Sequence, residues 1–128
     1  MCLYVNIDDT NNFIKRNKNK KEIIVWKVLD KIDCSTYVTP YMGCNVKLNS
    51  YFSAENPLPR YTITNYTETI HDGAIHVFLT RKQARLECGS TEEVTIRCIA
   101  KISNFIACNY EDNEACFTKI KIGKNEKG

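Results

Sequence analysis

Apolar and polar residues alternate along much of this chain with the period of two that is typical of β-strands. The densest apolar run, Ile-Ile-Val-Trp-Lys-Val-Leu at residues 23–29, predicts a central strand that is buried on both faces. Residues 93–102 alternate more regularly, with one face formed by Val94, Ile96, Cys98 and Ala100. These two segments predict the middle of a sheet.

Shorter apolar segments predict the remaining strands, at residues 2–7, 46–52, 60–70, 74–79, 105–108 and 115–122. An ordered arm is the alternative for the first of them, and a hairpin arm for the third. Pro40 restricts the backbone and Gly43 permits positive φ, so residues 39–43 are expected to reverse the chain.

Helix signals are fewer. Thr80 stands at an N-cap position before the helix-forming residues 81–87, and Gln83 occupies the capping-box position. A polar loop is predicted at about residues 8–21, with a short helix as the alternative. The polar tail from about residue 123 is expected to fray.

A length of 128 residues is typical of one domain. The predicted elements add up to an α+β fold, with a single strand-rich, mainly antiparallel sheet and one or two helices. We therefore expect a single domain over residues 1–128. Because no apolar run approaches the roughly 20 residues that span a bilayer, no membrane partner is expected.

Net charge adds little to this picture. Eighteen basic residues against 15 acidic ones give a formal charge of +3, which argues against nucleic acid as a partner. The exception is residues 15–21, where Lys15, Arg16, Lys18, Lys20 and Lys21 crowd together. A solvated loop is the plain interpretation of this segment, and a nucleic-acid or localisation patch is the alternative.

Seven cysteines form an odd set with no Cys-x-x-Cys pair, which is typical of a reducing compartment. Asp8 and Asp9 interrupt the opening apolar residues, so no signal peptide is predicted and a cytoplasmic location is expected. Cys98 and Cys108 fall in apolar segments and are expected to be buried. Neither cysteines nor histidines have zinc-ligand spacing, so we expect no metal and no cofactor.

Five residues are candidates for a ligand pocket: Lys27, Tyr41, His76, Thr80 and Arg81. Lys27 must reach the sheet edge or face a pocket, because an unpaired buried ammonium group is costly. His76 is either a ligand contact or general base, or a histidine hydrogen-bonded to the backbone. Thr80 and Arg81 would present a hydroxyl, backbone N–H groups and a cation to a phosphate, or form an ordinary helix cap.

Aromatic and thiol groups extend this set of candidates. Tyr41, like Tyr37, Tyr61 and Tyr66, could stack on a base, whereas core packing explains these rings equally well. Removal of the initiator methionine would give Cys2 a free amine beside its thiol, as in N-terminal nucleophiles. No paired base for Cys2 is evident in the sequence.

Several motifs in order resemble a group of small uncharacterised phage, viral and bacterial proteins. They are the opening Met-Cys-Leu-Tyr, Ile-Val-Trp-Lys-Val-Leu at 24–29, Thr-Pro-Tyr at 39–41, Gly-Ala-Ile-His-Val-Phe at 73–78 and Val-Thr-Ile-Arg-Cys at 94–98. The resemblance implies a phage or large-virus origin but no settled activity. Residues 74–75 and 115–118 depart from the pattern of that group.

A looser similarity is to the ADP-ribosyltransferase architecture. In that architecture a first strand carries a basic residue, a later strand carries histidine before a helix, and a last strand supplies glutamate. The matching positions here would be Lys27, His76 with Thr80 and Ala84, and Glu114. Fold analogy alone does not establish an activity.

Three functions are compatible with these observations. The first is non-enzymatic capture of a phosphate-bearing, nucleotide-derived small molecule, such as a host immune signal in the cytoplasm of an infected cell. The second is an enzyme of ADP-ribosyl-transfer or phosphoester-cleaving type that uses His76 with Glu114 or Cys2. The third is an interaction module that inhibits a host protein. All three are compatible with a homo-oligomer, because a strand-rich domain leaves sheet edges to cover.

Overall fold

The computed structural model describes residues 3–33, 36–39, 44–59, 69–70, 73–89 and 93–125. In chain order the elements are β1 (Leu3–Tyr4), α1 (Ile7–Arg16), β2 (Glu22–Lys31), β3 (Tyr37–Val38), β4 (Asn45–Val46), β5 (Tyr51–Ser53), β6 (Thr69–Ile70), β7 (Ile75–Phe78), α2 (Arg81–Leu86), β8 (Glu93–Lys101), a 3₁₀ helix (Ile102–Asn104), β9 (Phe105–Asn109), β10 (Glu114–Phe117) and β11 (Lys119–Asn125). The expected α+β class with a mainly antiparallel sheet is confirmed.

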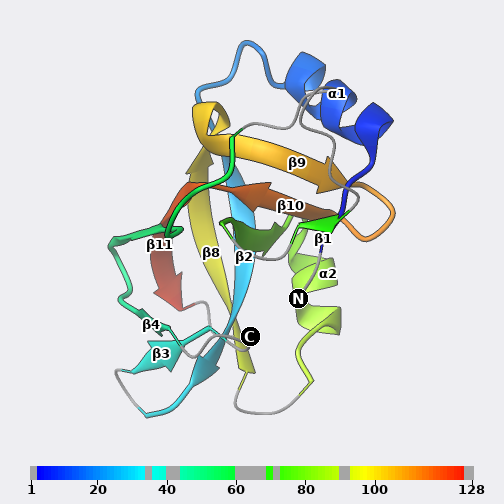
Figure 1. Ribbon diagram of the computed structural model, residues 1–128. Helices are drawn as coiled ribbons and strands as arrows, with labels where there is room; N and C mark the ends of the chain where they lie inside the picture. Colours follow the sequence, from blue (N-terminus) through cyan, green and yellow to red (C-terminus); the bar gives the residue numbers. More distant parts are fainter. Residues whose placement is uncertain are drawn as a thin grey trace.

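The main sheet has the strand order β5-β11-β8-β2-β7-β10-β9, and all its pairs are antiparallel. β8 and β9 belong to one segment of the chain, and β10 and β11 belong to the next. These two segments pair twice, as β8 with β11 and as β9 with β10. Between the two pairings one segment turns through the 3₁₀ helix Ile102–Asn104 and the other bends at Thr118. The sheet therefore folds over itself, and β9 and β10 run across β8 (Figure 1).

The main core lies inside this fold. Alternate residues of β2 and β8 point into it, including Val25, Leu29, Ile96 and Cys98, and Phe105 and Phe117 enter it from the second pair of strands. The outer surface of the sheet is covered in two places. β1 and β6 cover β9 and β10, and α2 packs Ala84 on Val28 and Phe78.

The helix is the correct alternative for most of the polar segment at residues 8–21. Asn6 caps α1 by accepting a hydrogen bond from the Asp9 backbone N–H at 2.9 Å, and Asp8 and Asp9 lie in its first turn. Phe13 anchors the helix in the core by stacking on Phe105, with ring centroids 4.1 Å apart. The expected polar loop is wrong for residues 8–16, which are helical. The signals of this helix are the Asn6 cap and the two acidic residues of the first turn, not apolar periodicity.

α1 also closes an edge of the sheet. The Thr10 hydroxyl accepts a hydrogen bond from the Cys108 N–H at 3.1 Å and donates to the Cys108 carbonyl at 3.4 Å. Nearby, the Tyr110 N–H donates to the Asp9 carboxylate at 2.8 Å. Side chains of α1 thus occupy backbone groups on β9 that an edge strand would otherwise leave open.

Replacing Thr10 with valine should destabilise the protein by about 1 to 3 kcal/mol, because buried backbone groups of Cys108 lose their partner. Urea unfolding followed by circular dichroism measures this change. Thr10→Ser keeps the hydroxyl and should lose less stability than Thr10→Val. A valine variant as stable as the wild type would show that the edge contact contributes nothing.

Two expected strands are divided in the structure. Residues 46–52 are split between β4 and β5, because Asn49 adopts a positive φ of 59° in the turn between them. Residues 115–122 are split at Thr118, where the chain passes from one layer to the other. β11 continues to Asn125 and so includes the first three residues of the tail that was expected to fray.

The expectation for residues 23–29 is confirmed in part, and that for residues 39–43 agrees with the structure on both sides of the turn. β2 is central, but Ile24 is 45% exposed, so the strand is not buried on both faces along its whole length. The chain does reverse around residues 39–43, since the Thr39 N–H donates to the Cys44 carbonyl and β3 pairs with β4. Residues 40–43 and 60–68 lie outside the described part of the chain.

Candidate functional site

The outer surface of β5, β11, β8 and β2 carries a row of side chains that cross the four strands. Register places Tyr51 opposite Lys121, Lys121 opposite Ile99, and Ile99 opposite Ile24. Directly opposed residues of antiparallel strands point to the same side of a sheet. Because strands alternate, Lys119 and Lys101 belong to this side too, while Ile122 and Cys98 point into the core.

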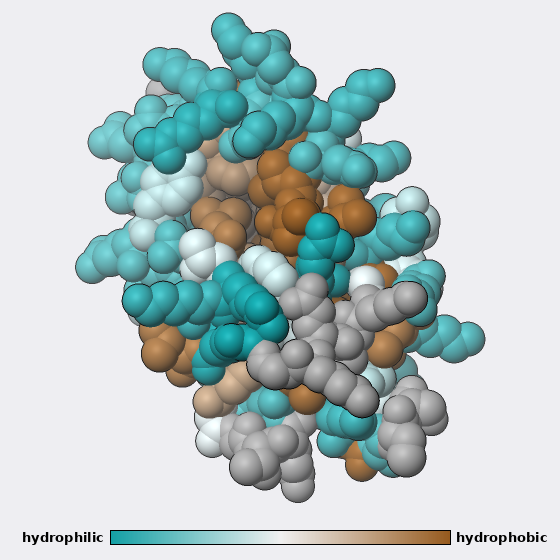
Figure 2. Space-filling model, turned by 180° about the vertical axis from the view of Figure 1, so that it is seen from behind, coloured by the Kyte–Doolittle hydropathy of each residue, from teal (hydrophilic) through white to brown (hydrophobic). Residues whose placement is uncertain are grey.

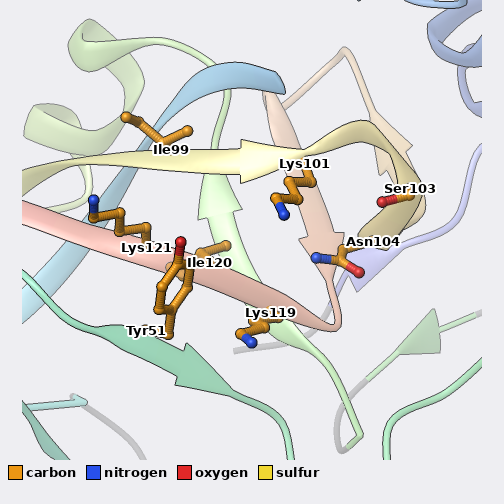
Figure 3. Close-up of a pocket in the computed structure, with 8 residues that line it drawn as sticks. All are labelled: Tyr51, Ile99, Lys101, Ser103, Asn104, Lys119, Ile120 and Lys121. Carbon is orange, nitrogen blue, oxygen red and sulfur yellow. The ribbon is translucent and has the colours of Figure 1, made fainter. Parts of the chain in front are cut away.

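A hollow of about 430 Å³ lies on this surface. Its lining comes from β5, β8, β11 and the 3₁₀ helix and comprises Tyr51, Ile99, Lys101, Ser103, Asn104, Lys119, Ile120 and Lys121 (Figure 3). One end of the hollow is formed by Ser103 and Asn104. Both belong to the 3₁₀ helix that follows β8, where the sheet folds over. We call the surface that includes this hollow and Arg97 the open basic face.

Tyr51 is the aromatic centre of the open basic face. Its side chain is 58% exposed. The Lys119 Nζ lies 4.6 Å and the Lys121 Nζ 5.9 Å from the centre of its ring, within the range of cation–π attraction. The structure therefore holds two ammonium groups beside one exposed ring.

Cations dominate the electrostatics of the open basic face. Lys101, Lys119 and Lys121 line the hollow, and Arg97 lies two residues before Ile99 on the same side of β8. Glu22, opposite Lys101 in register, is the carboxylate beside them. Within the described ranges no ion pair is recorded for these three lysines, and Lys119 and Lys121 contact the Tyr51 ring, so the face has an excess of positive charge for an anion.

Apolar side chains are also exposed on the molecule. The large ones are Tyr4, Ile7, Ile24, Ile32, Tyr51 and Leu86. Figure 2 shows apolar side chains gathered near the middle of the view, with hydrophilic side chains around them. On the open basic face, Ile24 and Ile99 form an apolar strip beside the lysines.

Of the five residues singled out from the sequence, Lys27, His76, Thr80 and Arg81 lie in the described part of the chain, and none of these four lines the hollow. Lys27 lies on the core side of β2, and its Nζ donates a hydrogen bond to the His76 carbonyl oxygen at 2.8 Å. Loss of solvent lowers the pKa of Lys27 to about 8. β2 and β7 share the single pair Trp26–Phe78, so the Lys27 ammonium bridges them where they diverge.

His76 lies on the other side of the sheet from the Lys27 side chain. Its Nδ1 is 3.4 Å from the Cys116 Sγ, as in a thiol–imidazole pair. Burial raises the pKa of the Cys116 thiol well above its ordinary value, and Cys116 is fully buried. Since the thiolate is the nucleophile, this pair does not provide one at neutral pH.

Thr80 and Arg81 have structural partners. The Thr80 hydroxyl accepts from the Gln83 N–H at 3.2 Å, which confirms the predicted N-cap. The Arg81 guanidinium lies 5.6 Å from the centre of the Trp26 ring. Tyr41 and Cys2 lie outside the described residues.

The open basic face was missed by sequence reasoning, although a signal is present. Lys119 and Lys121 alternate with Ile120 and Ile122, so the strand pattern places both lysines on one exposed side. Lys101 follows Ile99 with the same spacing. The pattern does not reveal that these strands are neighbours or that Tyr51 joins them.

Glu114, which does not line the hollow, also has a shifted pKa. Partial burial, together with the nearby charges of Asp112 and Glu87, raises its pKa to about 7. The folded protein therefore binds this proton more tightly than the unfolded chain does. Its contribution to stability is present below about pH 4.5 and is lost as the pH rises through 7.

Between pH 4.5 and 7 the free energy of unfolding should fall by about 1 to 2 kcal/mol more in the wild type than in Glu114→Gln, after allowance for solvent screening of this half-buried carboxyl. Urea unfolding at several pH values, compared between wild type and variant, measures this difference. Glu55→Gln changes an exposed carboxylate and should keep the wild-type profile. Identical profiles for the wild type and Glu114→Gln would contradict the shift.

Two further observations concern the described residues only. No group of three histidine, cysteine, aspartate or glutamate side chains lies close enough together there to hold a metal ion. None of the helices there combines the length and the apolar character that crossing a membrane requires.

Comparison with known proteins adds no relative: no protein-family model, no curated protein and no solved structure matches this chain.

Proposed function

We propose that this protein captures a phosphate-bearing, nucleotide-derived ligand on the open basic face. The observation that carries the proposal is the exposed Tyr51 ring with the Lys119 and Lys121 ammonium groups beside it. Phosphate attracts ammonium groups, and a base stacks on an aromatic ring, so one nucleotide satisfies both features.

The rest of the hollow suits the same ligand. Lys101 offers a third ammonium group, and Ser103 and Asn104 offer hydroxyl and amide groups for a sugar or a base edge. Ile99 provides apolar surface beside them. This mixture of a few polar groups with apolar surface is typical of small-molecule sites.

Capture without turnover agrees with the chemistry of the face. Among the described residues that line the hollow there is no cysteine, histidine or carboxylate, the side chains most often used as nucleophile or general base. Under the viral origin that the resemblance implies, the protein would sequester a host signalling nucleotide. The enzymatic and protein-inhibitor alternatives predict different outcomes in the following test.

The test is calorimetric titration of the purified protein with ADP, NAD, a cyclic dinucleotide and inorganic phosphate. We expect at least one nucleotide to bind more tightly than phosphate and to be recovered intact after denaturation of the protein. Tyr51→Ala should weaken that nucleotide roughly tenfold or more, because base stacking is lost.

Tyr4→Ala is the matched control, since Tyr4 is another exposed tyrosine, at 63%, and should leave binding unchanged. Recovery of an altered nucleotide would favour the enzyme. Binding of none of the probes would reject the proposal.

A further inference from the structure

The turn between α1 and β2 carries three exposed lysines: Lys18, Lys20 and Lys21. The turn is held in place by backbone and amide contacts. The Asn17 side-chain amide donates to the Phe13 carbonyl at 2.8 Å, and the Lys20 N–H donates to the Asn17 carbonyl at 2.9 Å. The three ammonium groups therefore extend from a fixed backbone.

This turn lies against one end of the open basic face. The Ile102 N–H donates to the Lys21 carbonyl at 2.9 Å, and Ile102 begins the 3₁₀ helix that supplies Ser103 and Asn104 to the hollow. The next residue, Glu22, stands opposite Lys101 in the sheet. Two segments that are far apart in sequence thus bring their lysines to the same corner of the molecule.

The lysines of the hollow and those of the adjoining turn make up one series. Lys119, Lys121 and Lys101 line the hollow, and a backbone hydrogen bond between Lys21 and Ile102 joins the turn to its end. A mononucleotide in the hollow would engage the first part of this series. Only a ligand with several phosphates in a row would engage the whole of it.

We propose that the ligand is a single-stranded oligonucleotide, with one nucleotide in the hollow and its phosphate backbone running past Lys101 to the basic turn. This inference rests on the proposed function and specifies its ligand. Tyr51, Ile24 and Ile99 offer flat and apolar surface to unpaired bases, which a duplex keeps inside its stack. The formal charge of +3 argued against nucleic acid, but three lysines line the hollow and three more lie exposed on the turn that adjoins it.

The experiment compares a labelled dinucleotide, a labelled single strand of about 12 nucleotides and the matching duplex by fluorescence anisotropy. We expect the single strand to bind at least about tenfold more tightly than the dinucleotide. Replacing Lys18, Lys20 and Lys21 together by glutamine should remove most of that gain and leave dinucleotide affinity unchanged. The slope of log affinity against log salt should fall by about 2, as expected for three lost contacts.

The control variant carries Lys31→Gln, Lys47→Gln and Lys82→Gln, which remove the same charge at exposed positions away from the turn and the hollow. It should bind the single strand more tightly than the turn variant does. Equal affinity of the wild type for dinucleotide and single strand, equal effects of the two variants, or a duplex bound as tightly as the single strand would overturn this inference. Failure of every probe, the dinucleotide included, would instead overturn the proposed function.

Discussion

The Lys119→Glu/Lys121→Glu double variant should bind nucleotides at least about 100-fold more weakly than the wild type. Hydrogen bonds to charged groups contribute about 1.5 to 3 kcal/mol each, and two of them would be lost. The new carboxylates would also repel phosphate beside Tyr51, where both ammonium groups now lie. Calorimetric titration with the tightest nucleotide found for the wild type measures this loss.

A control with the same change in net charge separates local contact from overall electrostatics. Lys47→Glu/Lys82→Glu reverses two exposed lysines outside the hollow. It should keep the affinity within about threefold of the wild type, because surface charges beyond a Debye length are largely screened at physiological salt. Equal losses in both double variants would show that binding does not depend on the open basic face.

Phe105→Ala should lower the free energy of unfolding by about 3 to 5 kcal/mol, a large part of the stability of a small domain. Phe105 stacks on Phe13 at 4.1 Å and meets Phe117 edge to face at 5.6 Å between ring centres. Alanine would leave a cavity where α1 joins the two sheet layers. Urea unfolding at pH 7 gives the difference.

Phe105→Leu keeps most of the side-chain volume and should cost far less than alanine. A loss below about 1 kcal/mol for Phe105→Ala would mean that the three rings contribute little to stability. In that case α1 would be held by its polar contacts to β9 rather than by Phe13.

Periodic segments account for the part of the fold that sequence could predict. The period of two at residues 93–102 assigned Val94, Ile96, Cys98 and Ala100 to the core side of β8, as the structure confirms. Thr80 marked the start of α2 correctly because its cap is a local interaction. α1 was less visible because Phe13 and Thr10 are its only fully buried residues within the described helix.

The candidate site could not be predicted in the same way. Lys27 and His76 attract notice as polar residues in apolar strands, but the structure uses the Lys27 ammonium group to hold a backbone carbonyl. The open basic face unites Tyr51, Lys101 and Lys119, which lie far apart in the chain. Pairing between strands that are distant in sequence brings these three residues together, and the identity of each residue alone does not indicate which strands pair.

The segment from Glu114 to Asn125 pairs with β7 and β9 before Thr118 and with β8 and β5 after it. During synthesis, neither layer can be completed until this segment has left the ribosome. Until then, the earlier strands have unpaired edges. In addition, contacts such as that of Thr10 with Cys108 join residues that are 98 positions apart in the chain. Folding should therefore be slow, in the millisecond-to-second range of proteins dominated by long-range pairing.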